Sequence, residues 1–202
     1  MKRYVRSAMY AHDDYSDLDA FSANRFDRCT VARNTDDLEL MEVYAFDPDS
    51  LVKANLLENP NLTLDTFNMM VDTLGQTVLV RVATSTKTPP EILSSLLGHS
   101  DFEVRVRAAG NESTPIDSIA AHIQDKAVLR GVADNSNRNL FLDALMTSED
   151  PYVLSKLAKS TKTPREVLER LAQHSNTFIR YTAIKTLRNL DRRRDQRGRY
   201  TS

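Results

Sequence analysis

The sequence predicts an all-α fold, specifically a right-handed α-solenoid of about six to seven two-helix repeats of ~25 residues each. Three observations support this prediction. A turn motif recurs at a nearly constant step, helix-start signals accompany each copy of the turn, and apolar residues at helical spacing follow the turn.

The recurring turn is clearest in residues 81–93 and 156–168, which share a Ser-Thr-Lys-Thr-Pro sequence. The lysines of the two copies, Lys87 and Lys162, lie 75 residues apart, which is three repeat lengths. The Asn or Ser that begins each turn falls at positions 34, 59, 85, 111, 135 and 160, and a partial seventh copy covers Phe178–Leu190. A step of 24 to 26 residues suits a pair of short helices that buries its apolar side against neighbouring pairs.

Each turn ends with signals for a helix start. Thr88 and Thr163 are expected to be N-caps, and the prolines after them suit a first helical position. Glu91 and Glu166 follow three residues later, which is the spacing of a capping box.

Apolar stripes follow these helix starts, and Ile92, Leu93 and Leu96 form one of them. A second, shorter helix is expected after the next polar turn. Its predicted starts are Asp47 with Pro48, Ser100 with Glu103, and Asp150 with Pro151. Helices of this length are marginal in water by themselves, so stacking of the repeats is expected to stabilise them.

Residues 102–120 carry the repeat motif most completely, as Val104-Arg105-Val106-Arg107, Ala109, Asn111, Thr114-Pro115 and Ile119. This pattern resembles the leucine-rich repeat variant, a relative of the HEAT-type helical repeats, and the resemblance covers about residues 27–190. It implies a helical repeat fold and no particular ligand. The best-known member of that family adds a cysteine cluster for an iron–sulfur centre, which this chain, with one cysteine, cannot reproduce.

Three segments are expected: an N-terminal cap over 1–26, the repeats over 27–190, and a basic tail over 191–202. The opening residues, Met1 to Ala8, resemble the start of small proteins from bacteriophages and mobile elements.

Composition excludes several classes of protein. Cys29 is the single cysteine, so an intrachain disulfide or a multi-cysteine metal site cannot form, and a reduced, cytoplasmic setting is expected. No apolar run approaches the ~18 residues that span a bilayer. The net charge of −1 conceals a balance of +9 within residues 151–202.

The first candidate site is a ladder of cations that recur about once per repeat. It comprises Lys53, Arg81, Arg105, Arg107, Arg130, Lys156 and Arg180. Stacked repeats would align them into a groove for phosphates or for an acidic protein. Alternatively, each cation pairs with an acidic residue of the next repeat, such as Asp101, Glu103, Asp125 or Asp150.

The second candidate is the arginine-rich C-terminus, which includes Arg188, Arg192, Arg193 and Arg194. Arginine suits phosphate because its planar fork can bond two oxygens. A solvated terminal charge run is the competing interpretation.

Other chemistry finds little support in the sequence. His99 and His174 occupy equivalent positions three repeats apart, which indicates a role in a turn rather than in metal binding. No Gly-rich phosphate loop, nucleophile elbow or His-Glu-x-x-His motif is present. We therefore expect a non-catalytic, cofactor-free scaffold, an adaptor or inhibitor, that binds a protein partner. Nucleic-acid binding through the ladder and the C-terminal arginines is the alternative.

Overall fold

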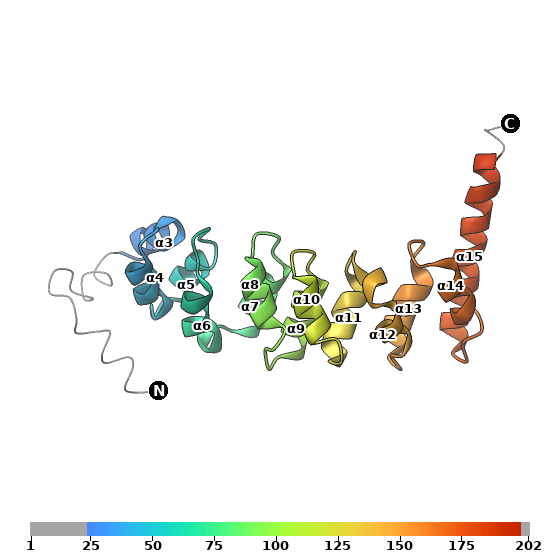
Figure 1. Cartoon of the computed structure of the whole chain (residues 1–202). Helices are drawn as coiled ribbons and strands as arrows, with labels where there is room; N and C mark the ends of the chain where they lie inside the picture. The colour runs from blue at the N-terminus through green and yellow to red at the C-terminus, as the bar shows by residue number, and fades with distance from the viewer. Residues whose placement is uncertain (1–23, 199–202) are drawn as a thin grey trace. The chain divides into compact units, whose positions relative to one another are not determined.

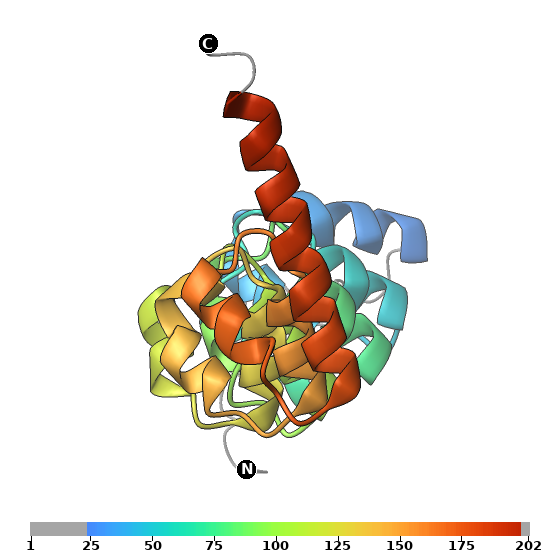
Figure 2. The same ribbon diagram turned by 90° about the vertical axis from the view of Figure 1, so that its right-hand side faces the viewer.

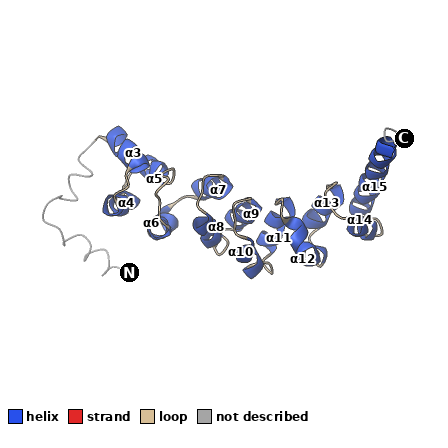
Figure 3. Cartoon of the chain, turned by 45° about the horizontal axis from the view of Figure 1, so that its top comes forward, coloured by secondary structure: helices blue, strands red, loops and turns tan. Residues whose placement is uncertain are grey.

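The computed structural model describes residues 24–198, with side chains to Arg194. Every regular element within this range is a helix, so the predicted all-α class is confirmed (Figure 3). The chain divides into two compact units at the bond between Lys87 and Thr88. Residues 1–23, which include most of the expected N-terminal cap, lie outside the described residues.

The first unit contains five short α-helices and one turn of 3₁₀ helix among its described residues. These are α3 (Arg25–Asn34), α4 (Leu38–Ala45), α5 (Ser50–Leu56), α6 (Leu64–Met70), η1 (Val71–Thr73) and α7 (Gln76–Thr84) (Figure 1). Helix α3 packs on α5, and α4 packs on α6, so helices two places apart in the chain lie side by side.

The second unit continues the alternation. It contains α8 (Pro90–Leu96), α9 (Phe102–Gly110), α10 (Ile116–Ala121), α11 (Lys126–Asp134), η2 (Arg138–Phe141), α12 (Leu142–Met146), α13 (Pro151–Lys159), α14 (Arg165–Leu171) and α15 (Thr177–Gly198). Helices α9, α11, α13 and α15 pack in sequence order, each against the next.

The recurring turn is held by one type of hydrogen bond. The side-chain oxygen of the anchor residue accepts from the backbone N–H two residues later, as Asn59 does from Asn61 and Ser160 does from Lys162. In the first copy, Thr35 makes this bond to the N–H of Asp37, whereas Asn34 is the last residue of α3. The prediction that Asn34 anchors the first turn is therefore wrong by one residue.

Two anchor asparagines also join successive repeats. The buried amide of Asn59 donates to the carbonyl oxygens of Ala32 and Thr35, at 2.9 and 2.8 Å. That of Asn135 donates to the carbonyl oxygens of Ala109 and Asn111, at 3.0 and 3.1 Å. The two asparagine amides therefore donate to carbonyl oxygens at the end of the preceding long helix, where the helix itself no longer supplies N–H donors.

The predicted threonine N-caps at Thr88 and Thr163 are wrong, and so are the capping boxes built on them. Helices α8 and α14 take Pro89 and Pro164 as cap residues, with no side-chain cap hydrogen bond. The Thr163 hydroxyl instead donates backward to the carbonyl oxygen of Leu157 at 2.9 Å. A proline after the threonine moves the cap by one residue, because Thr63, which no proline follows, does cap α6.

Four of the described helices that precede a turn, α5, α9, α11 and α13, are capped by an aspartate. The predicted start at Asp150 and Pro151 is confirmed, since Asp150 caps α13. The other two predicted starts are wrong by one or two residues, because Asp101 caps α9 and Asp49 caps α5. Where a Thr-Pro turn follows, the helix before the turn is also longer than the helix after it, not shorter: α9 has 9 residues and α10 has 6, and α13 has 9 and α14 has 7.

Helix α15 differs from the other helices of the second unit. Its first half packs on α13 and α14, and its second half extends past them (Figures 1 and 2). At the position where the other repeats form a turn, Thr186 is buried within α15, and no proline follows it. The helix therefore crosses the expected boundary at residues 190 and 191 without a break.

Candidate functional site

Five of the seven ladder cations are paired with carboxylates, in three patterns. In the first pattern a cation reaches the aspartate that precedes or caps the next long helix. Arg105 Nε lies 3.3 Å from Asp125 Oδ1, and Arg130 donates two hydrogen bonds to Asp150. Arg28, which the ladder did not include, pairs in the same way with the fully buried Asp47, at 2.9 Å.

In the second pattern a cation in the last turn of its helix pairs with an acidic residue of the preceding repeat. Lys156 Nζ lies 2.6 Å from Asp134, and Arg81 lies 3.6 Å from Glu58. In the third, Arg107 pairs within its own helix with Glu103. The alternative that the sequence left open, pairing of each cation with an acidic residue of the next repeat, is confirmed for Arg105 and Arg130 but not for the other five ladder cations.

The remaining two ladder cations make neutral hydrogen bonds. Lys53 Nζ donates to the hydroxyl of Thr73 at 3.3 Å, where other repeats carry an aspartate. Arg180 donates to the carbonyl oxygens of His174 and Ser175, as Arg105 does to those of His99 and Ser100. Most of the positive charge of the ladder is therefore matched inside the protein.

The pairs in the second unit surround two exposed aromatic rings. Arg105 lies 5.9 Å from the ring centroid of Phe102, and Arg130 lies 5.5 Å from the same ring. Arg130 also lies 5.4 Å from the centroid of Tyr152, and Lys156 lies 5.0 Å from it. Cations and rings therefore alternate across α9, α11 and α13, and we call these five residues the aromatic–cation surface.

The aromatic–cation surface is exposed and held in place. Phe102 and Tyr152 are 42% and 38% exposed. The Tyr152 hydroxyl donates to Asp134 at 2.7 Å, and the same carboxylate accepts from Lys156. Phe102 lies one residue after the N-cap of α9, and Tyr152 lies two residues after the N-cap of α13. Both side chains face away from the core.

Hydrogen bonds and ion pairs at this surface shift the pKa values of Asp125, Asp150 and Lys156 toward their ionised forms. The hydrogen bonds from Arg130 lower the pKa of Asp150, aided by the backbone N–H of Tyr152. Burial disfavours the Asp125 carboxylate, but backbone amides and Arg105 outweigh it and lower that pKa too. The hydrogen bond to Asp134 raises the pKa of Lys156. Each cation of the surface thus has a carboxylate as its counter-ion.

The histidines behave as the sequence predicts. His99 Nδ1 accepts from the N–H of Asp101, and His174 Nδ1 accepts from that of Asn176, both at 3.0 Å. The two histidines, at equivalent positions of their repeats, therefore play the same role in their turns. Within residues 24–194, no group of three or more histidine, cysteine or acidic side chains is arranged to hold a metal ion.

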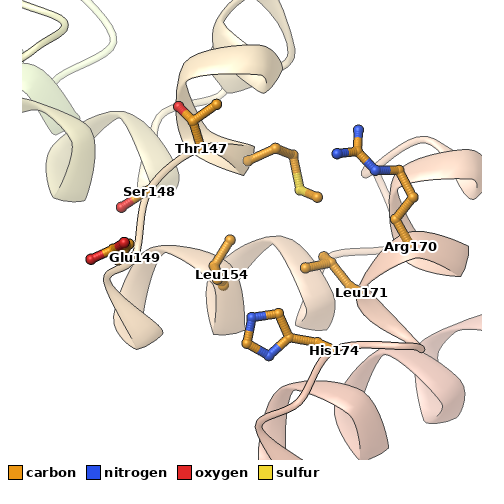
Figure 4. Close-up of a pocket in the computed structure, with 8 residues that line it drawn as sticks. Thr147, Ser148, Glu149, Leu154, Arg170, Leu171 and His174 are labelled. Carbon is orange, nitrogen blue, oxygen red and sulfur yellow. The ribbon is translucent and has the colours of Figure 1, made fainter.

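A shallow hollow of about 440 Å³ lies between α12, α13 and α14 (Figure 4). Leu154 and Leu171 line it, with His174 beside them and Glu149 and Arg170 toward its edges (Figure 4). His174 Nδ1 is engaged in its turn, and Glu149 and Arg170 lie apart from each other at the edges of the hollow (Figure 4).

The C-terminal arginines present their charge to solvent. Arg188, Arg192, Arg193 and Arg194 are all exposed on α15. The acidic residue among them, Asp191, is engaged by Arg165 at 2.7 Å. None of the helices described, α15 included, is long and apolar enough to cross a membrane.

No protein-family model, curated protein or solved structure matches this chain. The resemblance to the leucine-rich repeat variant therefore stays a prediction that rests on the repeat motif.

Sequence reasoning found the cations of the aromatic–cation surface but missed Phe102, Tyr152 and Asp134. The sequence does contain a pattern that could have identified the aromatic residues. Phe102, Tyr152 and Phe178 each lie at the start of a long helix, out of phase with its buried stripe, where a polar residue would be expected. Recurrence of an aromatic residue at an exposed slot indicates a surface feature rather than core.

Proposed function

We propose that the protein is a non-catalytic scaffold, an adaptor or inhibitor, that binds a protein partner through the aromatic–cation surface. The observation that supports this proposal is the alternation of arginine and lysine with exposed rings, each cation being neutralised by a carboxylate. Tyrosine and arginine are the residues that contribute most to binding energy at protein interfaces.

The charge balance favours a protein over a polyanion at this surface. Arg105, Arg130 and Lys156 face three carboxylates, so the surface carries little net charge. A phosphate backbone would compete with these carboxylates for the same guanidinium groups, whereas a neutral or mixed-charge protein surface would not. Fixed side chains also lose little conformational entropy when a partner binds.

We also propose that the repeats form a right-handed α-solenoid of six to seven units of the leucine-rich repeat variant type. The inter-repeat bonds of Asn59 and Asn135 support it, because they lie at equivalent positions in the two units. A cytoplasmic location is part of the same proposal, supported by the single thiol, Cys29, which is buried and free.

The test is a comparative pull-down from nuclease-treated lysate of the source cell. The bait is the full chain, either unchanged or carrying Phe102→Ala with Tyr152→Ala. We expect a stoichiometric protein partner that the double variant loses, by 10-fold or more in recovered amount, because truncation of a central aromatic anchor costs ~2 kcal/mol or more.

Leu38→Ala with Leu140→Ala is the matched control, since both leucines are exposed, at 53% and 63%, and lie outside the surface. This control should keep the partner. A partner that both double variants retain equally would show that the aromatic–cation surface is not the binding site.

A further inference from the structure

Helix α15 carries a second exposed surface, which consists of Phe178, Tyr181, Lys185, Arg188 and Arg192. Their spacing of three, four, three and four residues places all five on one side of the helix. We call this side the α15 face. The opposite side, with Ile179, Ala183 and Thr186, is buried.

The aromatic part of the α15 face is the more exposed of the two surfaces. Phe178 is 67% exposed and Tyr181 is 64% exposed. The two rings are three residues apart, which makes them neighbours on the helix surface. Unlike Phe102 and Tyr152, neither ring lies close to a cation within the described residues. Their faces are therefore open to a flat ligand.

The cationic part of the α15 face differs from the ladder in its pairing. Lys185, Arg188 and Arg192 are exposed, and none forms an ion pair with another described residue. Among the side chains that the structure describes, the carboxylate next to them in sequence is Asp191, which accepts from Arg165 on α14 instead. The charge of the α15 face is therefore available to an external anion.

We propose that the α15 face binds single-stranded nucleic acid, with Phe178 and Tyr181 stacking on bases and Lys185, Arg188 and Arg192 contacting consecutive phosphates. The combination of aromatic platforms with a row of cations is the arrangement that single-strand binding requires. A duplex fits less well, because its bases are already stacked on one another.

The order of residues also argues against a membrane as the ligand. A helix that lies on a bilayer places its apolar residues on one side and its cations on the other. Here aromatic residues and cations follow one another along a single side, and in the first half of the helix, which carries both rings, the opposite side is covered by α13 and α14. This site is separate from the aromatic–cation surface, and the inference does not depend on the function proposed for that surface.

The test is fluorescence anisotropy of labelled oligo(dT) and oligo(U), with duplex DNA of the same length for comparison, against the full chain at 50–200 mM salt. Two variants separate the two parts of the face. The charge variant is Lys185→Gln, Arg188→Gln, Arg192→Gln, and the aromatic variant is Phe178→Leu, Tyr181→Leu.

We expect the unchanged chain to bind single strands more tightly than duplex. In the charge variant, the slope of log affinity against log salt should become shallower by about 2, because each phosphate contact on a single strand contributes about 0.7. The aromatic variant should bind roughly 10-fold more weakly while keeping the unchanged slope, since stacking releases no counterions.

A control with the same loss of charge is Lys87→Gln, Lys159→Gln, Lys162→Gln, three exposed lysines that are not part of α15. It should keep nearly the full affinity, and circular dichroism verifies that every variant is folded. Equal binding of duplex and single strand with no effect of the aromatic variant would overturn the proposal. So would binding of an acidic polypeptide such as poly-glutamate in place of nucleic acid.

Discussion

At the scale of single residues, several described arginines connect one repeat to the next. Arg28, Arg105 and Arg130 each reach an aspartate 19 or 20 residues further along the chain. Asp125 and Asp150 also cap the helices that follow them. One carboxylate therefore satisfies both backbone amides at a helix start and a guanidinium from the preceding repeat.

The Arg130–Asp150 pair predicts a pH-dependent stability. The pKa of Asp150 is lowered in the folded protein, so its contribution is present above the unfolded pKa of ~3.9 and is lost as pH falls through the folded value. Asp150→Asn keeps a capping side chain but removes the charge. At pH 7 we expect it to lower the free energy of unfolding by ~1 kcal/mol, because Arg130 is partly exposed.

Urea unfolding at pH 7, 5 and 3 measures this effect. The difference between Asp150→Asn and the unchanged chain should shrink toward pH 3, because below ~3.9 the unfolded chain takes up a proton at Asp150 more readily than the folded chain. Asp143→Asn, at an exposed carboxylate of the same unit, controls for the loss of a negative charge. A difference that is as large at pH 3 as at pH 7 would contradict the assignment.

At the scale of elements, the sequence predicts the helices well and their ends poorly. The repeat length and the apolar stripes identify the all-α class, because apolar residues at a sustained helical spacing rarely occur outside helices. The ends are misplaced because several residues in each turn can cap. Ser100 and Asp101 compete for one helix start, and the outcome depends on His99, which accepts the N–H of Asp101.

The candidate sites show the same limit. The spacing of cations places them on the long helices, but their partners depend on a neighbouring repeat that is 20 residues away in sequence. The ladder cations also occupy three different positions relative to the turn that follows them. The repeat length of about 25 residues therefore could not show which cations share a pairing pattern. The α15 face lies within one helix, and its spacing could have been read directly from the sequence.

Helices α9 and α11 approach each other closely at Gly131. A Cβ atom added at Gly131 would lie 2.2 Å from the carbonyl oxygen of Val106 and 2.8 Å from the amide nitrogen of Gly110. Because both are backbone atoms, they cannot turn away. Gly131→Ala should therefore lower the free energy of unfolding by about 1–3 kcal/mol, despite the better helix propensity of alanine.

Gly110→Ala is the matched variant for this prediction. A Cβ at Gly110 would approach no atom closer than 3.5 Å, which is an ordinary contact. Thermal unfolding followed by circular dichroism should therefore show no loss of stability for Gly110→Ala, and a gain of up to ~1 kcal/mol. If both variants were equally destabilised, the close approach at Gly131 would not be the cause.

At the scale of the whole molecule, the contacts between helices are local in sequence. The strongest ones join α3 to α5, α9 to α11 and α13 to α15, which are helices two places apart in the chain. In proteins built this way, stability is close to a sum of terms for each repeat and for each interface between neighbours. A defect in one repeat should therefore weaken its neighbours more than distant repeats.

The two inter-repeat asparagines test this expectation as a pair. Asn59→Ala removes two donated bonds in the first unit, and Asn135→Ala removes two in the second. Each leaves buried carbonyl oxygens without those partners, at a cost of ~2–4 kcal/mol. Hydrogen exchange followed by mass spectrometry should rise most in α3–α5 for Asn59→Ala and most in α9–α13 for Asn135→Ala. A uniform rise across both units in either variant would instead indicate one cooperative fold, in which each repeat depends on all of the others.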